Sequence, residues 1–382
     1  MLQAHDFDVI VAGAGPAGTS AAIHLARTGF RVLLVEQKKF PRPKLCGEFI
    51  SPECRQHFQD LGVADAISLS GPTSLTETVF YSSGGHRVTV PSKWFGGSIA
   101  LGLSRAVMDH VLLRRAQECG VTVLEGASIS EPLTNGTGVL GVKVKADGAE
   151  QDYQAPLTID ATGRARILTR RINPAEARSK PALVAFKVHL RNTRVAPNAC
   201  EIYFYKDGYG GLSTIEDNLS NLCFIVSAEQ VKRYRSDPET VMREFVMKNR
   251  RAAHTLEQAA AESEWLSASW EHFGRQRPSP ARGLLAIGDS AAFIDPFTGS
   301  GMLMAFESGA LAADVITRHR DRLTSAELTA DYTRAYIRKF DSRLRICGLL
   351  RRAAFKPRLA GLGIALFDAS EPLRNRLVRA TR

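Results

Sequence analysis

The sequence predicts an α/β protein in which a parallel, doubly wound sheet is interrupted by an inserted antiparallel sheet and followed by a helical tail. Near the N-terminus, an apolar run at 8–12 leads through a glycine-rich turn into an alanine-rich helix and a second apolar run at 31–36. This is a β–α–β pattern. A further apolar run at 284–287 ends in Gly288-Asp289, after many short β-like segments between 181 and 269. The parallel sheet is therefore expected to be discontinuous in sequence, with a second domain threaded through it.

The composition is that of a folded protein with more than one domain. The chain has 382 residues, of which 44% are hydrophobic and 23% charged, and this length exceeds what one small core needs. Its six cysteines show no CxxC pair and no metal-ligand spacing, so we expect free thiols in a reducing compartment and no metal site. No apolar run approaches the roughly 18 residues needed to span a bilayer. We expect a cytoplasmic protein that is at most peripheral to a membrane.

The net charge of +11 suggests an anionic partner, with nucleic acid, a membrane surface and a phosphorylated cofactor as the candidates. Part of this charge lies in Arg338–Arg358, which holds eight lysines and arginines and one acid, with apolar residues between them and an apolar run, Leu359–Phe367, after them. An interfacial helix on anionic lipid fits this pattern. A C-terminal helix packed on the protein, with a solvated basic face, fits it as well and is our preferred interpretation. No nucleic-acid partner is expected, and the sequence leaves the oligomeric state open.

The glycine-rich turn has the spacing of a dinucleotide-binding fingerprint. In Gly13-x-Gly15-x-x-Gly18, the first glycine allows a tight turn, the second lets backbone approach a pyrophosphate, and the third lets helix and strand pack closely. Pro16 and Ala17 begin the helix, whose free N–H groups favour an anion. Glu36 ends the next apolar run and is placed to accept hydrogen bonds from a ribose hydroxyl.

A second glycine-rich segment follows the apolar run at 284–287. Asp289 at the carboxyl end of a parallel strand can hold a sugar-like hydroxyl. The turn Pro296-x-x-Gly299-x-Gly301-Met302 opens a long helix predicted to reach about His319, and its N–H groups can face an electron-rich ring edge or an oxyanion. Taken alone, this segment is also compatible with a capped core helix.

These two segments, together with Arg105 at the start of a helix capped by Ser104, resemble the FAD-dependent oxidoreductases of the p-hydroxybenzoate hydroxylase superfamily. The loop Pro41-Arg-Pro-Lys-Leu-Cys46-Gly47-Glu48 is most similar to that of the geranylgeranyl reductase-like branch. The resemblance covers about residues 1–170 and 280–335. It implies a Rossmann-like FAD-binding domain with an inserted antiparallel β-sheet substrate domain and a C-terminal helical tail. We expect the FAD-binding domain at 1–72, 100–170 and 280–335, the substrate domain at 73–99 and 171–279, and the tail at 336–382.

The resemblance also implies roles for matching positions. The three fingerprint glycines would hold the FAD pyrophosphate and Glu36 the adenosine ribose. Arg105 would reach the pyrophosphate or the ribityl region, and Asp289 would hold the ribityl chain. The turn from Gly299 through Gly301 to Met302 would face the isoalloxazine edge, where a helix N-terminus stabilises the anion of reduced flavin.

Three departures from the family pattern bear on the reaction. Glu48 stands where the reductase-like branch has the second glycine of Cys-Gly-Gly, and it is expected to tune the flavin or to act as a proton donor or base. Flavin-dependent halogenases also carry Gly-Glu here, but the sequence has no Trp-x-Trp-x-Ile-Pro stretch of the kind they use, so halogenation is disfavoured. Thr162 in Asp160-Ala-Thr-Gly-Arg164 replaces an acid that couples FAD and NADPH binding in the hydroxylases. The aromatic strand at 203–211 lacks the tryptophan and the Phe-Pro-Lys ending of the reductases.

The sequence therefore predicts an FAD-dependent oxidoreductase whose electron donor is NADPH, NADH or another source. Oxidation or hydroxylation of a hydrophobic, aromatic or polyketide-like small molecule is the preferred reaction. C=C reduction of a prenyl or lipid substrate is the main alternative, halogenation is disfavoured, and a non-enzymatic flavin-binding membrane protein has little support. Cys46, Glu48 and Tyr209 are the expected catalytic residues. Cys46 is equally explained as a small buried hydrophobe, and Tyr209 as one of the tyrosines that line a substrate pocket or pack in the core.

Overall fold

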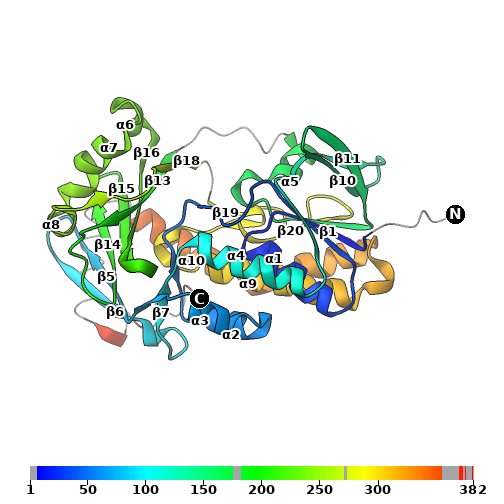
Figure 1. The fold of residues 1–382 in the computed structure, drawn as a ribbon, viewed down its shortest axis with the longest axis horizontal. Coiled ribbons are helices and arrows are strands. Elements are labelled where there is room, and N and C mark those ends of the chain that lie inside the picture. The colour runs from blue at the N-terminus through cyan, green and yellow to red at the C-terminus, as the bar shows by residue number, and fades with distance from the viewer. Residues whose placement is uncertain are drawn as a thin grey trace.

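The computed structural model describes residues 7–174, 182–270 and 273–354, together with 370–372, 375 and 381. Two layered units lie side by side in Figure 1, the parallel sheet with its helices toward the N-terminus and the antiparallel sheet on the opposite side. Leu359–Phe367 lies outside the described residues, and so do residues 355–358 of the expected basic segment.

The first unit is built on a five-stranded parallel sheet of order β20-β12-β1-β2-β8. Its strands are β1 (Val9–Ala12), β2 (Val32–Glu36), β8 (Thr122–Glu125), β12 (Leu157–Asp160) and β20 (Leu284–Ala286). Every residue of β1, β2 and β12 is buried, which is the condition of strands covered on both faces and explains their continuous apolar runs. The last strand comes from residues far along the chain, so the expected discontinuous α/β fold is confirmed.

Helices cover one face of this sheet and a small antiparallel sheet covers the other. The helices are α1 (Pro16–Arg27), α4 (Arg105–Glu118) and α9 (Gly301–Arg318), and the strands are β9 (Ser128–Thr134), β10 (Val139–Ala146) and β11 (Ala149–Gln154). Val9 and Val11 of β1 pack toward the helices, whereas Ile10 packs toward Val142 on the other side. A Cβ on Gly309 would lie 2.5 Å from the carbonyl oxygen of Ala17, so this glycine allows α9 to pack closely on α1.

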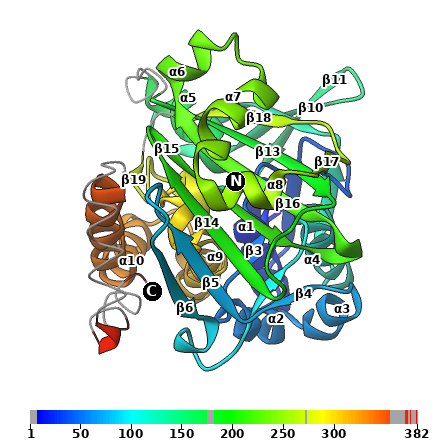
Figure 2. The ribbon, with the colours of Figure 1, turned by 90° about the vertical axis from the view of Figure 1, so that its left-hand side faces the viewer.

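The second unit is an eight-stranded sheet of order β17-β13-β16-β15-β14-β5-β6, with β18 paired to β13. Its strands are β5 (Glu77–Tyr81), β6 (Arg87–Pro91), β13 (Leu183–Arg191), β14 (Ala199–Tyr205), β15 (Gly208–Thr214), β16 (Ser220–Ser227), β17 (Ala260–Ala261) and β18 (Leu266–Trp270). β5 and β14 run parallel and all other neighbours antiparallel. Residues 77–91 thus join residues 183–270 in one sheet, which faces the viewer in Figure 2.

Three short helices cover this sheet: α6 (Ala228–Arg233), α7 (Pro238–Phe245) and α8 (Arg250–Leu256). The mixed acidic and basic sequence at 238–261 predicts one helical stretch, and the structure breaks it at Asn249. The Asn249 side chain accepts hydrogen bonds from the N–H groups of Arg251 and Ala252, and its amide nitrogen donates to Phe204 O at 3.0 Å. A side chain that caps a new helix and also bonds to the sheet fixes the break.

Smaller elements connect the two units. They are α2 (Cys54–Leu61), α3 (Ala64–Leu69), α5 (Ile167–Ile172), the sheet formed by β3 (Phe49–Ile50), β7 (Ala100–Gly102) and β4 (Thr73–Leu75), and the pair β19 (Gly274–Arg275) and β21 (Ala292–Phe293). All six cysteines are free thiols. Within the described ranges, no helix is both long and apolar enough to cross a membrane.

The long helix α10 (Ala326–Ala354) runs beside both units (Figure 2). Tyr336 and Phe340 are fully buried against the core of the parallel-sheet unit. Arg343 is paired with Glu307 at 2.7 Å, and Asp341 with Arg275 at 2.8 Å. One face of this basic helix is therefore packed on the protein. Its binding to a membrane stays a prediction.

Candidate active site

A cavity of about 490 Å³ runs from the glycine-rich turn to the edge of the antiparallel sheet. Its walls come from segments that lie far apart in sequence but converge at the carboxyl ends of the parallel strands, where open α/β sheets bind ligands. The expected site residues that line it are Gly13, Gly15, Pro16, Ala17, Glu36, Cys46, Glu48, Arg105, Asp289, Gly299, Gly301 and Met302. Cys223 and Trp270 line it from the antiparallel sheet. Gly18 and Tyr209, also expected at the site, lie behind this wall.

The fingerprint glycines differ in what they permit. A Cβ on Gly13, whose φ is +104°, would lie 2.5 Å from the carbonyl oxygen of Ala161, and a Cβ on Gly18 would lie 1.9 Å from that of Gly13. Both are glycine because backbone occupies the side-chain space. Gly15 faces the cavity, where the nearest atom to its Cβ position is an Arg105 nitrogen at 3.8 Å. Backbone N–H groups at the start of α1 can thus approach a pyrophosphate.

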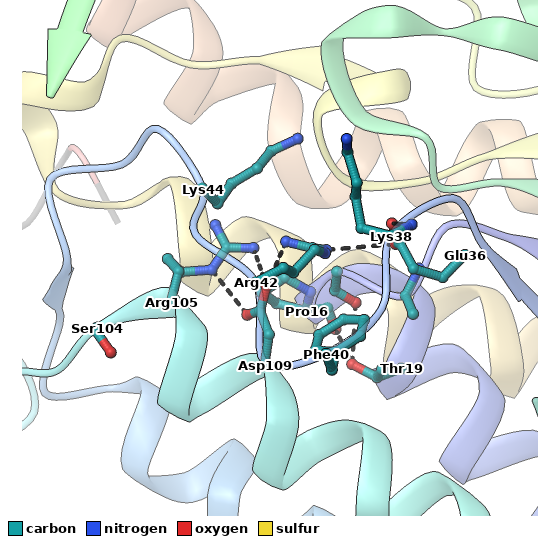
Figure 3. Close-up of polar contacts among 12 residues, drawn as sticks. Pro16, Thr19, Glu36, Lys38, Phe40, Arg42, Lys44, Ser104, Arg105 and Asp109 are labelled. Atoms are coloured by element: carbon teal, nitrogen blue, oxygen red, sulfur yellow. Dashed lines mark hydrogen bonds and ion pairs between the residues drawn. The ribbon is translucent and has the colours of Figure 1, made fainter. Parts of the chain in front are cut away.

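A buried chain of ion pairs supports the middle of the cavity (Figure 3). Arg105 binds Asp109 through two hydrogen bonds of 2.8 and 2.7 Å. Arg42 lies 3.3 Å from Asp109 and 3.4 Å from Glu36. Asp109 was not predicted from the sequence, although an Arg-x-x-x-Asp pair on a helix is a readable i,i+4 signal. It holds two arginines whose guanidinium groups border the cavity.

The Glu36 carboxylate accepts hydrogen bonds from two backbone N–H groups. Its Oε2 accepts a hydrogen bond from Ala14 N at 3.0 Å, and its Oε1 accepts one from Lys38 N at 3.1 Å. It lines the cavity all the same, and a carboxylate oxygen can accept more than one hydrogen bond. The structure therefore leaves acceptor capacity for a ribose hydroxyl at the position that the sequence predicted.

The cavity carries more positive charge than its own acids neutralise. Among the described residues, Lys38, Lys44 and Arg164 line it and take part in no ion pair. Figure 3 shows Lys38 and Lys44 extending to the same side of the ion-pair chain. Burial and the nearby Arg105 and Arg42 lower the pKa of Lys44, and burial raises the pKa of Asp289. The shift of Lys44 indicates a site that would be stabilised by a bound anion.

These observations fit FAD. Its pyrophosphate supplies the negative charge that the cavity lacks, and the open backbone at Gly15 meets the requirement for close approach. Arg42 Nε is buried and has no hydrogen-bond partner in the described part of the chain, so a donor remains for the cofactor. Gly13, Gly15, Glu36, Arg105 and Asp289 are the residues that would hold FAD, and Gly18 supports them by allowing the close packing of the turn.

The turn before α9 forms the other end of the cavity. Gly288 and Gly299 both have positive φ, 55° and 65°, and Gly288 donates its N–H to Ser308 Oγ at 2.9 Å. Ser300 precedes α9 and provides no side-chain cap. The first N–H groups of α9, near Gly301 and Met302, are therefore available as hydrogen-bond donors. The predicted contact with an electron-rich ring edge requires such donors.

Glu48 is fully buried, with a φ of 53°, and its carboxylate is bound by three nitrogen partners. Arg105 N donates to Oε1 at 2.8 Å and Lys187 Nζ donates to the same oxygen. His189 Nε2 lies 2.7 Å from Oε2. Burial alone would raise the pKa of Glu48, but His189 and Lys187 lower it overall. The carboxylate is thus held ionised and anchored to β13 rather than poised to release a proton.

Lys187 and His189 were missed because nothing in the alternating sequence of β13 marks them as partners of a loop about 140 residues earlier. Lys187 is 2% exposed and also donates to Lys44 O at 3.1 Å. Asn221 of β16 donates to Cys46 O at 3.1 Å. The antiparallel sheet therefore holds the Cys46–Glu48 loop in place.

Tyr209 lies on β15 and is 5% exposed. Its hydroxyl donates to Asp295 Oδ1 and accepts from Phe297 N at 3.2 Å. Burial and the neighbouring Asp295 carboxylate raise its pKa well above the usual value. The structure places it at the root of the Pro296 loop, where it can position that loop but does not reach the cavity wall.

Arg164 and Trp270 are further residues that the sequence did not identify. The Arg164 guanidinium lies 4.9 Å from the ring centroid of Trp270 and 5.4 Å from that of Phe293, within the range of cation–π attraction. Trp270 is the last residue of β18, and Phe293 lies on β21. Arg164 directly follows Gly163, and the sequence predicted no role for its charge.

Comparison with known proteins agrees with the cofactor. Residues 6–318 match the model of a family described as FAD binding domain. The chain is 24% identical over 337 residues to a 1H-pyrrole-2-carbonyl-[peptidyl-carrier protein] brominase of Pseudoalteromonas luteoviolacea, which covers 84% of this chain and 80% of that protein. It is 26% identical over 349 residues to digeranylgeranylglycerophospholipid reductase 1 of Methanococcoides burtonii, covering 89% and 79% of the two chains. Its fold matches that of the flavin-dependent brominase Bmp2 with a TM-score of 0.81 at 21% identity, over 98% and 93% of the chains.

Proposed function

The chain belongs to the FAD-binding domain family and is an FAD-dependent enzyme, and we propose that it uses reduced FAD, oxygen and a halide ion to halogenate a hydrophobic small molecule. This differs from the hydroxylation that the sequence favoured. Hydroxylation is not confirmed, and the relatives support the alternative that we had disfavoured.

The observation that supports an oxygen-dependent reaction is the state of Glu48 and Tyr209, two of the three expected catalytic residues. Reduction of an isolated C=C bond requires a proton donor beside the substrate. Glu48 is buried and held ionised by His189 and Lys187, and the Tyr209 hydroxyl donates to Asp295. Neither group is free to complete a reductive addition. Electrophilic attack on an aromatic carbon makes no such demand on them.

Halogenation is preferred over hydroxylation on two grounds. The sequence shares Gly47-Glu48 with flavin-dependent halogenases, and a brominase is among the relatives that match most of the chain. In addition, Arg164 lines the cavity beside Trp270, and any positive charge left over once FAD is bound would raise the local concentration of halide. The missing Trp-x-Trp-x-Ile-Pro stretch means that other side chains must shape the substrate side.

The protein's contribution to this reaction is binding, shape and exclusion of water. Bound FAD supplies the electrons that activate oxygen. Gly13, Gly15 and Glu36 bind the nucleotide half of the cofactor, and Asp289 accepts from its sugar-like chain. Trp270 and Cys223 present apolar surface from the antiparallel sheet, which favours a hydrophobic substrate and keeps bulk water away.

Purified enzyme reduced without oxygen tests this proposal. The reduced protein is mixed with buffer containing oxygen and either bromide, chloride or neither, in the presence of an electron-rich phenol or pyrrole, and products are identified by mass spectrometry. We expect a halogenated product that requires both oxygen and halide. An oxygenated product independent of halide would instead establish hydroxylation.

A reductase is the second candidate, because the Methanococcoides burtonii reductase matches 89% of this chain and Cys46 borders the cavity. The reductase activity is tested by incubating the reduced protein with a prenyl lipid in the absence of oxygen. Reoxidation of FAD with saturation of a C=C bond, in the absence of oxygen, would contradict the halogenase proposal. NADH and NADPH are compared as donors, and Thr162 leads us to expect slow direct reduction by either.

A further inference from the structure

Asp295 lies at the base of the loop that enters α9 and is only 2% exposed. Its carboxylate has partners from three parts of the molecule. Oδ1 accepts from the hydroxyl of Tyr209 on β15 and from Phe297 N at 3.2 Å. Oδ2 lies 3.2 Å from Nε of Arg351 on α10. One carboxylate therefore joins the antiparallel sheet, the Pro296 loop and the C-terminal helix.

Arg351 is itself held by an aromatic cluster. Its guanidinium lies 3.7 Å from the ring centroid of Phe273. Phe273 stacks on Phe293 at 4.8 Å with an interplanar angle of 18°, and Trp270 meets Phe293 edge-on at 5.1 Å. Trp270 and Phe293 line the cavity. The last described turns of α10 are thus connected to the cavity wall by contacts that leave little freedom for Arg351.

The loop that Asp295 anchors provides the cavity wall at Pro296, Gly299, Gly301 and Met302. Asp295 also forms the N-terminal cap of the turn Pro296–Thr298, because its side chain accepts from Phe297 N. Loss of this cap would release the turn on which the first N–H groups of α9 depend. A buried charge so near a redox cofactor also influences the free energy of the reduced, more negative state.

We propose that Asp295 is a positioning residue for FAD, and that its ion pair with Arg351 couples the C-terminal helix α10 to the reduction potential of the flavin. Tyr209 supplies the third anchor, from the substrate sheet. The inference depends on FAD binding and not on which reaction the enzyme performs, so it stands or falls separately from halogenation.

Because Asp295 and Arg351 carry opposite charges, removing one or the other should shift the reduction potential of FAD in opposite directions. Removing Arg351 leaves a buried, uncompensated carboxylate that disfavours the negative reduced flavin, whereas neutralising Asp295 removes that carboxylate. At pH 8 and a fixed solution potential, we expect R351Q to lower the ratio of reduced to oxidised FAD about tenfold, which corresponds to 1.4 kcal/mol. D295N should raise the ratio, and the double variant should return it toward the wild-type value.

Burial raises the pKa of Asp295 to about 6, which adds a signature that a merely structural role would not produce. Within the described ranges, the titratable and charged groups that face it are Tyr209 from β15 and Arg351 from α10. At pH 5 the carboxyl group is mostly protonated in the wild type, so the difference between D295N and the wild type should shrink there.

The experiment is spectroscopic redox titration of the FAD-bound protein with an indicator dye, at pH 8 and pH 5. R345Q is the matched control, because Arg345 lies on α10 and pairs with Asp341 at 2.6 Å but is 79% exposed. It should leave the potential unchanged, and R351K, which retains the charge, should remain near the wild type. If R351Q does not fold, D295N and R351K still decide the matter. Shifts of the same sign in D295N and R351Q, or no shift in D295N, would overturn the proposal.

Discussion

The cluster around Glu48 gives the sharpest distinction between an anchor and a catalytic acid. The substitution Glu48→Gln keeps the size of the side chain but removes its charge. Oε1 can still accept from Arg105 N, which lies 2.8 Å away in the native protein. The new amide nitrogen, however, takes the place of Oε2 and faces His189, and the neutral oxygen binds the Lys187 ammonium group more weakly, so two charge-assisted hydrogen bonds are lost or weakened.

The expected loss of stability in Glu48→Gln follows from the burial of the ion pair. Lys187 is 2% exposed and Glu48 is fully buried, and removing one partner of a buried ion pair costs about 3–5 kcal/mol. Lys187 keeps its hydrogen bond to Lys44 O at 3.1 Å, which offsets part of the loss. We therefore expect Glu48→Gln to lower the free energy of unfolding by about 2–4 kcal/mol, measured by urea denaturation of the FAD-free protein. The double variant with Lys187→Met should recover much of this, because it no longer buries an unpaired ammonium group.

The pH dependence has a defined sign. The folded pKa of Glu48 lies below its ordinary value of 4.5, so the stability that it provides is present above about that pH and is lost as the pH falls through the folded pKa. Glu48→Gln should reduce this acid-side loss. If Glu48→Gln had wild-type stability and bound FAD normally but had lost all activity, Glu48 would be a catalytic group and the anchoring role would be refuted.

Three further predictions concern the cofactor and the fold. Gly18→Ala should abolish FAD binding in a fluorescence titration, because its Cβ would lie 1.9 Å from a carbonyl oxygen, whereas Gly348→Ala on α10, with nothing within 4 Å, should bind FAD normally. Asp109→Asn should weaken FAD binding roughly tenfold or more through loss of the charge that orients Arg105, with circular dichroism as the check on folding. Because burial raises the pKa of Asp295 to about 6 from 3.8, its contribution to stability should fall as the pH rises from 4 to 6. The corresponding slope in denaturation midpoints should be flatter in Asp295→Asn.

The sequence predicted the parts of the site that backbone geometry dictates. Gly13 and Gly18 are readable because their side-chain space is filled by backbone carbonyl groups. Glu36 and Asp289 are readable because Glu36 ends one parallel strand and Asp289 closely follows another, which brings them to one edge of the sheet. Gly13, Glu36 and Asp289, together with the turn before α9, line one cavity in the structure.

What the sequence could not provide is the identity of contacts between units. Glu48 looked like a candidate acid because its partners Lys187 and His189 lie on a strand whose register is fixed only by folding. Tyr209 looked like a pocket residue for the same reason, since its hydroxyl meets Asp295, 86 residues later. Their roles as catalytic residues remain predictions, and the structure favours anchoring and positioning.

The most direct test of the proposed function is the dependence of product formation on halide in a single turnover of reduced, FAD-bound protein. With a phenol or pyrrole acceptor and oxygen present, we predict a brominated product in bromide buffer, a much lower yield without halide, and none without oxygen. Product formation that continues undiminished in halide-free buffer, or without oxygen, would contradict the account.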